Sequence, residues 1–118
     1  MWISGAPGQA ALGLAHLQRR ITLTEPALSR CLTALHRPQP RVELGLALRG
    51  VANAAIDVSD GLLADLGHVL QQSNVGAELE DAKLPLPGDA DVSLALLREC
   101  VLAGGDDYEL LFTAATAQ

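Results

Sequence analysis

Three oxygen-bearing side chains, Asp57, Ser59 and Asp60, stand at the end of an apolar run in the middle of the chain. In an extended strand Asp57 and Ser59 point to the same side, and Asp60 lies where the strand gives way to a helix beginning near Leu62. Such oxygens beside the free N–H groups of a helix start suit a divalent cation and a phosphate. Ser59 or Asp60 can equally cap that helix. A carboxylate inside an apolar strand, as at Asp57, is costly unless it is paired or binds a metal.

A second group of acids follows two glycines in the segment Gly104-Gly-Asp-Asp-Tyr-Glu109. Adjacent glycines let the backbone turn sharply or approach a ligand closely. A plain helix end and turn with solvated carboxylates has the same composition, so the segment alone leaves both interpretations open. The glycine turn at residues 5–8 lacks the lysine and hydroxyl of a phosphate-binding loop, and a tight turn explains it.

No other combination of reactive side chains is arranged for catalysis. The histidines at positions 16, 36 and 68 are not spaced as metal ligands, and His68 is expected on the polar face of a helix. No Ser–His–Asp or Cys–His arrangement supports a hydrolase. Cys31 and Cys100 fall at apolar helical positions, which indicates two buried thiols in a reducing compartment.

Hydrophobic periodicity predicts the elements that must position these residues. Helices are expected at about 9–20, 26–36, 42–49, 62–72 and 92–102, and strands at 2–5, 54–58, 75–84 and from 108 onward. Strands interleaved with helices predict an α+β fold, in which helices are layered against a mixed sheet. We expect residues 1–118 to form a single domain.

Composition narrows the classes of partner. The chain has 14 acidic and 8 basic residues, a net charge of −6, and its arginines are scattered, which argues against nucleic-acid binding. An anionic ligand such as ATP therefore requires divalent metal ions to bridge carboxylate and phosphate. No apolar run is long enough to span a membrane, and the N-terminus is unlike a signal peptide. These features predict a cytoplasmic protein that does not bind membranes.

Both ends of the sequence fall within expected strands. One strand begins directly after Met1, and another is expected to start near Tyr108, almost at the other end. Domains seldom start and stop in the middle of an element. We therefore expect the chain to be truncated at both ends.

Two motifs taken together resemble the thiamine-monophosphate kinases. The first is Asp57-Val-Ser-Asp-Gly-Leu-Leu-Ala-Asp-Leu-Gly-His68, and the second is Gly104-Gly-Asp-Asp-Tyr-Glu-Leu110. The segments at 2–8, 37–41 and 53–57 match the same family in the same order. The resemblance implies the C-terminal domain of a two-domain, dimeric member of the aminoimidazole ribonucleotide synthetase superfamily. It also implies that an N-terminal domain, which supplies much of the ATP and magnesium site, is absent here, together with the last segment of the C-terminal domain.

The resemblance also implies a reaction and roles for particular residues. Members of the family transfer the γ-phosphate of ATP to thiamine monophosphate, giving thiamine diphosphate, with Mg²⁺ screening the repulsion between two anions. By position in the motifs, Asp57 and Asp60 match magnesium ligands, Ser59 matches a nucleotide contact, and Asp106 matches an acid that contacts the substrate. The family usually has glutamate at position 106, so the shorter Asp106 reaches about one methylene less.

Two alternatives remain open from the sequence. The same scaffold carries other ATP-using enzymes, of the aminoimidazole ribonucleotide and selenophosphate synthetase types. A chain without the N-terminal domain can also be a non-catalytic binding or assembly module. We expect the isolated 118-residue chain to have no kinase activity, because half of the ATP and metal site lies outside it.

Overall fold

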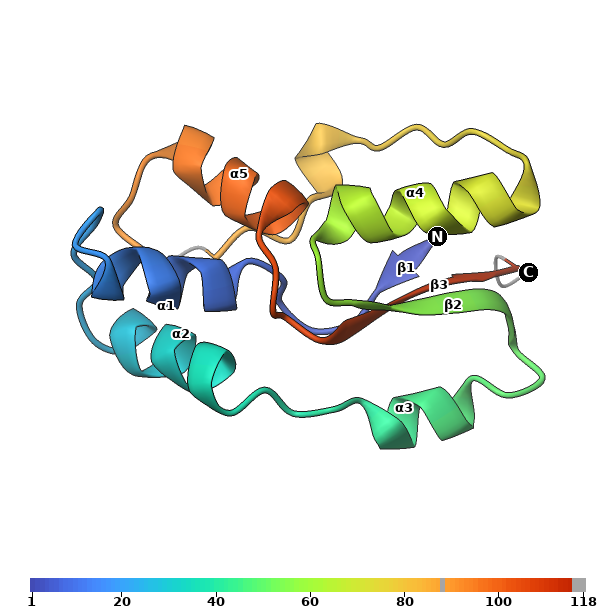
Figure 1. The fold of residues 1–118 in the computed structure, drawn as a ribbon, viewed down its shortest axis with the longest axis horizontal. Coiled ribbons are helices and arrows are strands. Elements are labelled where there is room, and N and C mark those ends of the chain that lie inside the picture. The colour runs from blue at the N-terminus through green and yellow to red at the C-terminus, as the bar shows by residue number, and fades with distance from the viewer. Residues whose placement is uncertain (88, 116–118) are drawn as a thin grey trace.

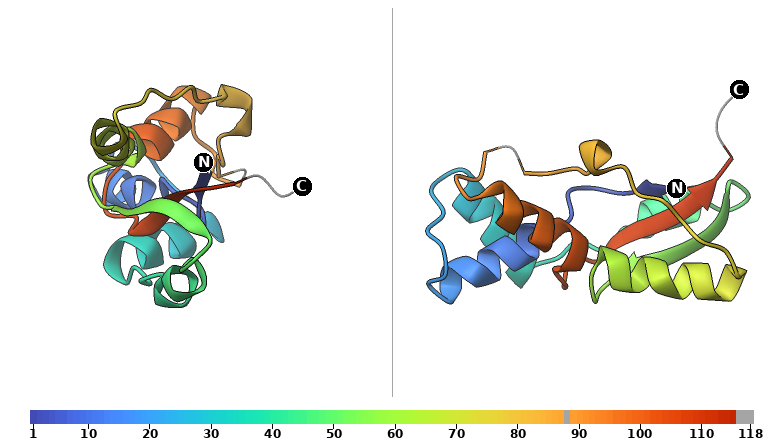
Figure 2. Two further views of the ribbon diagram at one scale, coloured as in Figure 1. Left: turned by 90° about the vertical axis from the view of Figure 1, so that its right-hand side faces the viewer. Right: turned by 90° about the horizontal axis from the view of Figure 1, so that it is seen from above.

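A computed structural model describes residues 1–87 and 89–115. In chain order its elements are β1 (Trp2–Ile3), α1 (Gln9–Leu17), α2 (Ala27–His36), α3 (Val42–Ala47), β2 (Ala52–Val58), α4 (Leu62–Ser73), a 3₁₀ turn (Asp81–Lys83), α5 (Leu94–Ala103) and β3 (Glu109–Ala114). The α+β class is confirmed, and each α-helix begins and ends within three residues of its predicted bounds. Helices α1, α2 and α5 gather at one end of the molecule and the sheet lies at the other (Figures 1 and 2).

The sheet is small and β3 is its central strand. The strand order is β1-β3-β2, and β3 pairs antiparallel with both neighbours. The register places Trp2 opposite Phe112 and Asp57 opposite Leu110. Among the described strands all pairing is therefore antiparallel, where the sequence predicted a mixed sheet. The C-terminal strand lies between the first and second strands, so residues far apart in sequence become neighbours at the ends of β2 and β3.

The prediction of a strand at residues 75–84 is wrong. These residues form an extended connection and then the 3₁₀ turn Asp81–Lys83, with no strand pairing. Positions 75–78 are exposed, and of this segment Leu79 packs partly against the core beneath α4. Leu79 and Leu84 are the half-buried residues of 75–84, and their spacing is not the alternation of a strand.

In the described part of the chain, two separate cores hold the elements together. Leu12, Cys31, Leu97 and Cys100 contribute to the first, between α1, α2 and α5. The predicted burial of both cysteines is confirmed, and burial raises the pKa of each thiol. The residues of the second core, between α4 and the sheet, are Val58, Leu62, Leu66 and Leu111.

The two faces of the sheet differ. Helix α4 covers one face, and α3 lies on the opposite side (Figure 1). Val58 points into the core under α4, so Asp57, its neighbour in β2, points to the other face. Helix α3 has no buried residue, and its Val42 and Leu46 are 64% and 59% exposed. No helix among residues 1–87 and 89–115 is long and apolar enough to cross a membrane.

Candidate functional site

The two acidic motifs of the sequence meet in space. The backbone N–H of Asp106 donates to the carbonyl of Ser59 at 2.8 Å, and that of Tyr108 donates to the carbonyl of Val58 at 2.8 Å. A Cβ on Gly105 would lie 2.9 Å from the Ser59 oxygen, so this close approach requires a glycine. The loop from α5 to β3 thus runs directly against the connection from β2 to α4 (Figure 1).

Asp57 and Asp60 both present their carboxylates to solvent. Within the described residues neither carboxylate takes part in a hydrogen bond or an ion pair, so their oxygens remain available to a ligand. Asp57 lines an open hollow of about 450 Å³ with Tyr108, Leu110 and the first residues of α3. Asp60 lies on the turn that leads into α4. The half-buried Ser59 lies between them in sequence.

The interpretation of Ser59 or Asp60 as a helix cap is wrong. The N-cap position of α4 is Gly61, at φ 128°, and no side chain caps the helix there. Instead Asp65, in the first turn of α4, reaches back and accepts hydrogen bonds from the backbone N–H groups of Ser59 and Asp60 at 2.9 and 3.0 Å. Asp65 is only 3% exposed. An acid in the first turn of a helix is the sequence signal that could have identified it.

Asp60 has two further neighbours that the sequence did not associate with it. Asp60, Asp65 and His68 each place one ligand atom within 4.8 Å of the other two. Asp57 is not a member of this group. The structure therefore brings Asp60 together with side chains of α4 and leaves Asp57 on the other face of the sheet.

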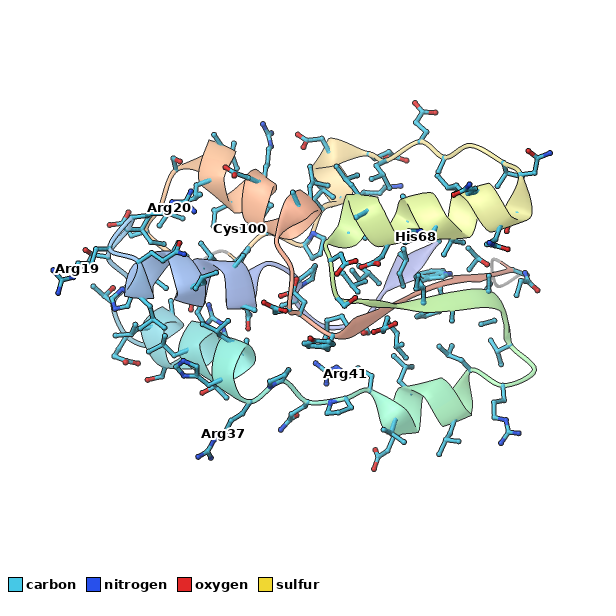
Figure 3. All side chains as sticks on the ribbon, viewed as in Figure 1. Arg19, Arg20, Arg37, Arg41, His68 and Cys100 are labelled. Carbon is cyan, nitrogen blue, oxygen red and sulfur yellow. The ribbon has the colours of Figure 1, made fainter. Side chains whose placement is uncertain are left out.

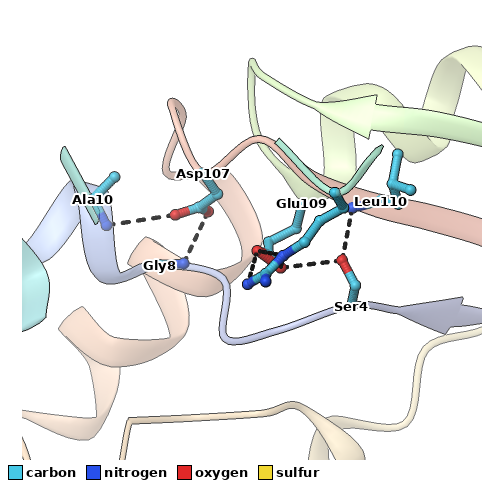
Figure 4. Close-up of polar contacts among 7 residues, drawn as sticks. Ser4, Gly8, Ala10, Asp107, Glu109 and Leu110 are labelled. Carbon is cyan, nitrogen blue, oxygen red and sulfur yellow. Dashed lines mark hydrogen bonds and ion pairs between the residues drawn. The ribbon is translucent and has the colours of Figure 1, made fainter. Parts of the chain in front are cut away.

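Asp107 is half-buried, and its carboxylate points toward the start of α1. Its carboxylate accepts from the N–H of Gly8 at 2.9 Å and from that of Ala10 at 3.4 Å (Figure 4). Burial raises the pKa of Asp107 from its usual 3.8 to about 6, and this outweighs the lowering by the two N–H donors. The last N–H of the glycine turn at residues 5–8, that of Gly8, thus binds a carboxylate of the chain itself. The interpretation of the second motif as solvated acids is wrong for this residue.

Glu109 is also buried, with 6% of its surface exposed. Arg41 binds it with two nitrogens, Nε at 2.8 Å and a terminal nitrogen at 2.7 Å. The Ser4 hydroxyl donates to Glu109 at 3.0 Å and accepts from the N–H of Leu110 at 2.8 Å (Figure 4). The ion pair and its hydrogen bonds raise the pKa of Arg41. Glu109 therefore joins β3 to the segment after β1 and to the start of α3.

A hollow of about 730 Å³ lies elsewhere and does not contain the predicted metal ligands. Its wall includes Asp107, Glu109, Arg30, Arg37 and Arg41. Arg37 and Arg41 come from the connection between α2 and α3, whereas Arg19 and Arg20 lie at the far end of α1 (Figure 3). Positive charge at this hollow is largely balanced, because Arg30 pairs with Asp89 and Arg41 pairs with Glu109.

Asp106 and Tyr108 are the outward-facing residues of the loop. Asp106 is exposed and borders a groove between α1 and α5, and Tyr108 is 39% exposed beside Asp57. Both have left-handed backbone conformations, with φ of 66° and 53°. The loop thus presents Asp106 and Tyr108 and turns Asp107 and Glu109 inward.

Comparison with known proteins identifies relatives over nearly the whole chain. The thiamine-monophosphate kinase of Escherichia coli K12 is 43% identical over 96% of this chain. The crystal structure of the thiamine-monophosphate kinase from Stenotrophomonas maltophilia K279a superimposes with a TM-score of 0.87, at 47% identity over 97% of the chain. The chain is homologous to thiamine-monophosphate kinases. No protein-family model matches it.

The homology covers part of each relative. The chain spans 36% of the E. coli kinase and 38% of the S. maltophilia structure. A third relative, AaThiL complexed with AMPPCP and TMP, has a TM-score of 0.78 and 34% identity, and the match covers 95% of this chain and 38% of that one. The predicted likeness to the aminoimidazole ribonucleotide synthetase fold is confirmed by these neighbours.

Proposed function

We propose that this chain forms part of an enzyme that transfers the γ-phosphate of ATP to thiamine monophosphate, giving thiamine diphosphate. One observation carries the proposal: the Gly-Gly-Asp-Asp-Tyr-Glu loop is hydrogen-bonded to the end of β2, beside two exposed carboxylates that have no partner among residues 1–87 and 89–115. The chain is also 43% identical to a thiamine-monophosphate kinase over 96% of its length. The chain then corresponds to most of the C-terminal domain, and a second domain supplies the rest of the ATP site.

Asp57 and Asp60 are proposed to hold Mg²⁺. Their donor chemistry fits, because both are exposed carboxylates, and oxygen ligands of this kind suit a hard cation that keeps several waters. When bound, magnesium neutralises charge on the phosphates and aligns them. Asp57 lies in β2 on the side of α3, and Asp60 lies on the turn beside Asp65 and His68 of α4, so they belong to different parts of the site. Asp65 assists by fixing the backbone of Ser59 and Asp60 through its two hydrogen bonds.

Ser59 and Asp106 are proposed to contact the two substrates. Ser59 contacts the nucleotide at the turn where β2 ends. Asp106 lies next to it, held by the hydrogen bond from its N–H to the Ser59 carbonyl. The carboxylate of Asp106 complements the positive charge of the thiamine ring system. Substrate binding at Asp106 and nucleotide binding at Ser59 would thus be adjacent, as transfer between two bound molecules requires.

The proposal includes the localisation, oligomeric state and partners of the full protein. We infer a cytoplasmic homodimer that uses magnesium and binds neither nucleic acid nor membranes, from the family resemblance and the net charge of −6. Light scattering of the full-length protein tests the dimer: a monomer at micromolar concentration would contradict it.

A chimera tests the reaction itself. The matching third of the E. coli kinase is replaced by this chain, and thiamine diphosphate formed from ATP and thiamine monophosphate is measured. We expect turnover by the chimera and none by the isolated chain. In the chimera, Asp106→Ala should raise the KM for thiamine monophosphate, whereas Asp91→Asn, at an exposed aspartate outside the site, should not. A folded chimera that binds ATP but does not phosphorylate thiamine monophosphate would contradict the proposal.

A further inference from the structure

We propose that Asp107 and Glu109 are positioning residues, which clamp the loop so that Asp106 and Tyr108 project from the end of β2. The inference rests on the proposed function for what Asp106 touches, and on the geometry alone for how the loop is held. Four successive residues alternate outward and inward: Asp106 and Tyr108 are exposed, and Asp107 and Glu109 are anchored inside.

The backbone of the loop needs such a clamp. Asp106 and Tyr108 have φ of 66° and 53°, a region that non-glycine residues adopt at an energetic cost. For tyrosine the cost is not relieved by a short polar side chain, as it can be for aspartate. Such conformations persist only where the surrounding contacts determine them. In this conformation the N–H groups of Asp106 and Tyr108 donate to the carbonyls of Ser59 and Val58. We infer that side-chain contacts on either side of Tyr108 help to maintain the conformation.

Asp107 supplies the first anchor. Its two oxygens accept from the N–H groups of Gly8 and Ala10, at the start of α1 and about a hundred residues earlier in the chain. These N–H groups have no partner inside their own helix, so the carboxylate satisfies donors at the positive end of the helix dipole. The loop is thereby tied to the core formed by α1, α2 and α5.

Glu109 supplies the second anchor on the other side of Tyr108. Arg41 binds the buried carboxylate with two nitrogens, and the Ser4 hydroxyl donates to it. This contact requires a glycine at position 5, since a Cβ there would lie 1.9 Å from a Glu109 oxygen. Tyr108 therefore lies between two fixed carboxylates, each attached to a different part of the molecule.

The first test uses amide hydrogen exchange in the 118-residue chain, measured residue by residue by NMR. In Asp107→Asn and Glu109→Gln, we expect the protection of the Asp106 and Tyr108 amides to fall at least tenfold. The amides of Leu12 and Val101, in the helical end of the molecule, should change less than twofold. An equal loss at all four amides, or no loss at Asp106 and Tyr108, would overturn the proposal. If a variant does not fold, Ser4→Ala removes one contact to Glu109, and the same local loss is expected at Tyr108.

The second test uses the chimera described above. Asp107→Asn should raise the KM for thiamine monophosphate about tenfold while kcat changes less than threefold, because the reacting groups remain and the Asp106 contact is misplaced. A fall in kcat with KM unchanged would overturn the positioning role. The exchange result does not depend on turnover. A chimera without kinase activity therefore refutes the proposed function, and unchanged loop amides refute the clamp.

Discussion

The end of β2 and the loop that leads into β3 are both acidic, but their carboxylates differ in exposure and in hydrogen-bond partners. Asp57 and Asp60, at the end of β2, are exposed and have no protein partner within the described residues. Asp107 and Glu109, in the loop and at the start of β3, are turned inward, and each accepts hydrogen bonds from distant segments. Both regions carry acidic side chains, so burial and partners separate carboxylates that hold the structure from those available to a ligand.

The difference has an energetic basis. A buried carboxylate is tolerated when donors surround it, and removing its partner leaves an uncompensated charge. Replacing an exposed carboxylate changes the free energy of unfolding little, because water solvates the side chain in both the folded and the unfolded protein. Substitutions of Asp107 and Glu109 should therefore change stability, and substitutions at the end of β2 should change ligand binding.

The largest loss of stability is expected from Gly5→Ala. The new Cβ would lie 1.9 Å from Oε2 of Glu109, and φ of 61° is strained for alanine. Arg41 and Ser4 fix the glutamate, so it cannot move away freely. We expect a loss of roughly 3 kcal/mol in urea unfolding. The matched control Gly67→Ala, in α4 with open space around it, should stabilise by up to about 1 kcal/mol. Equal effects of the two substitutions would show that Glu109 is not held in place.

Arg41→Met should have the next largest effect. It leaves Glu109 buried without its cation, at a cost of about 2 kcal/mol, since the 38% exposure of Arg41 moderates the loss. Arg98→Met removes an exposed ion pair with Asp81 and should cost less than about 1 kcal/mol. Chemical denaturation of both variants measures the contrast. A cost at Arg41 no greater than at Arg98 would argue that the Glu109 pair does not stabilise the fold.

The pH dependence of stability should report Asp107. Its pKa is about 6 in the folded protein and near 3.8 in the unfolded chain, so the folded state holds the proton more tightly. This contribution is fully present below pH 3.8 and is lost as the pH rises through 6. The stability of the native chain relative to Asp107→Asn should thus fall by about 1 kcal/mol between pH 4 and 7, after allowing for solvent screening. A flat difference, or a rise, would contradict the burial of Asp107.

The smallest change in stability is expected at the end of β2. Asp57→Asn and Asp60→Asn should each alter the free energy of unfolding by no more than about 0.5 kcal/mol. Titration with Mn²⁺ as a probe should nevertheless show weaker binding, by threefold or more, and Asp91→Asn serves as the control. A large loss of stability with unchanged Mn²⁺ affinity would reverse the assignment of the two regions.

The sequence predicted much of this arrangement, and its failures have a common physical cause. The helices were predictable because their apolar residues repeat at helical spacing, and the strand ending at Val58 because it is a short apolar run before a glycine. The separation of Asp57 from Asp60 by the sheet was not predictable, because it depends on which face of β2 α4 covers. Asp107 and Glu109 were missed as structural residues because their partners, backbone N–H groups near α1 and an arginine, are far away in sequence. Asp65 has nearby partners, and its place in the first turn of α4 was a local signal that could have identified it. Residues 75–84 alternate weakly like a strand, but only Leu79 and Leu84 among them are half-buried and none pairs with a strand of the sheet.

The central claim is that the exposed carboxylates at the end of β2 serve phosphate transfer. The most direct measurement is the rate of thiamine diphosphate formation by the chimera with Asp60→Asn, compared with Asp91→Asn at saturating substrates. Loss of a metal ligand predicts a rate lower by about tenfold to a hundredfold for Asp60→Asn, with no change in the free energy of unfolding, and a native rate for Asp91→Asn. Equal rates for the two variants at saturating and at limiting magnesium would contradict the account.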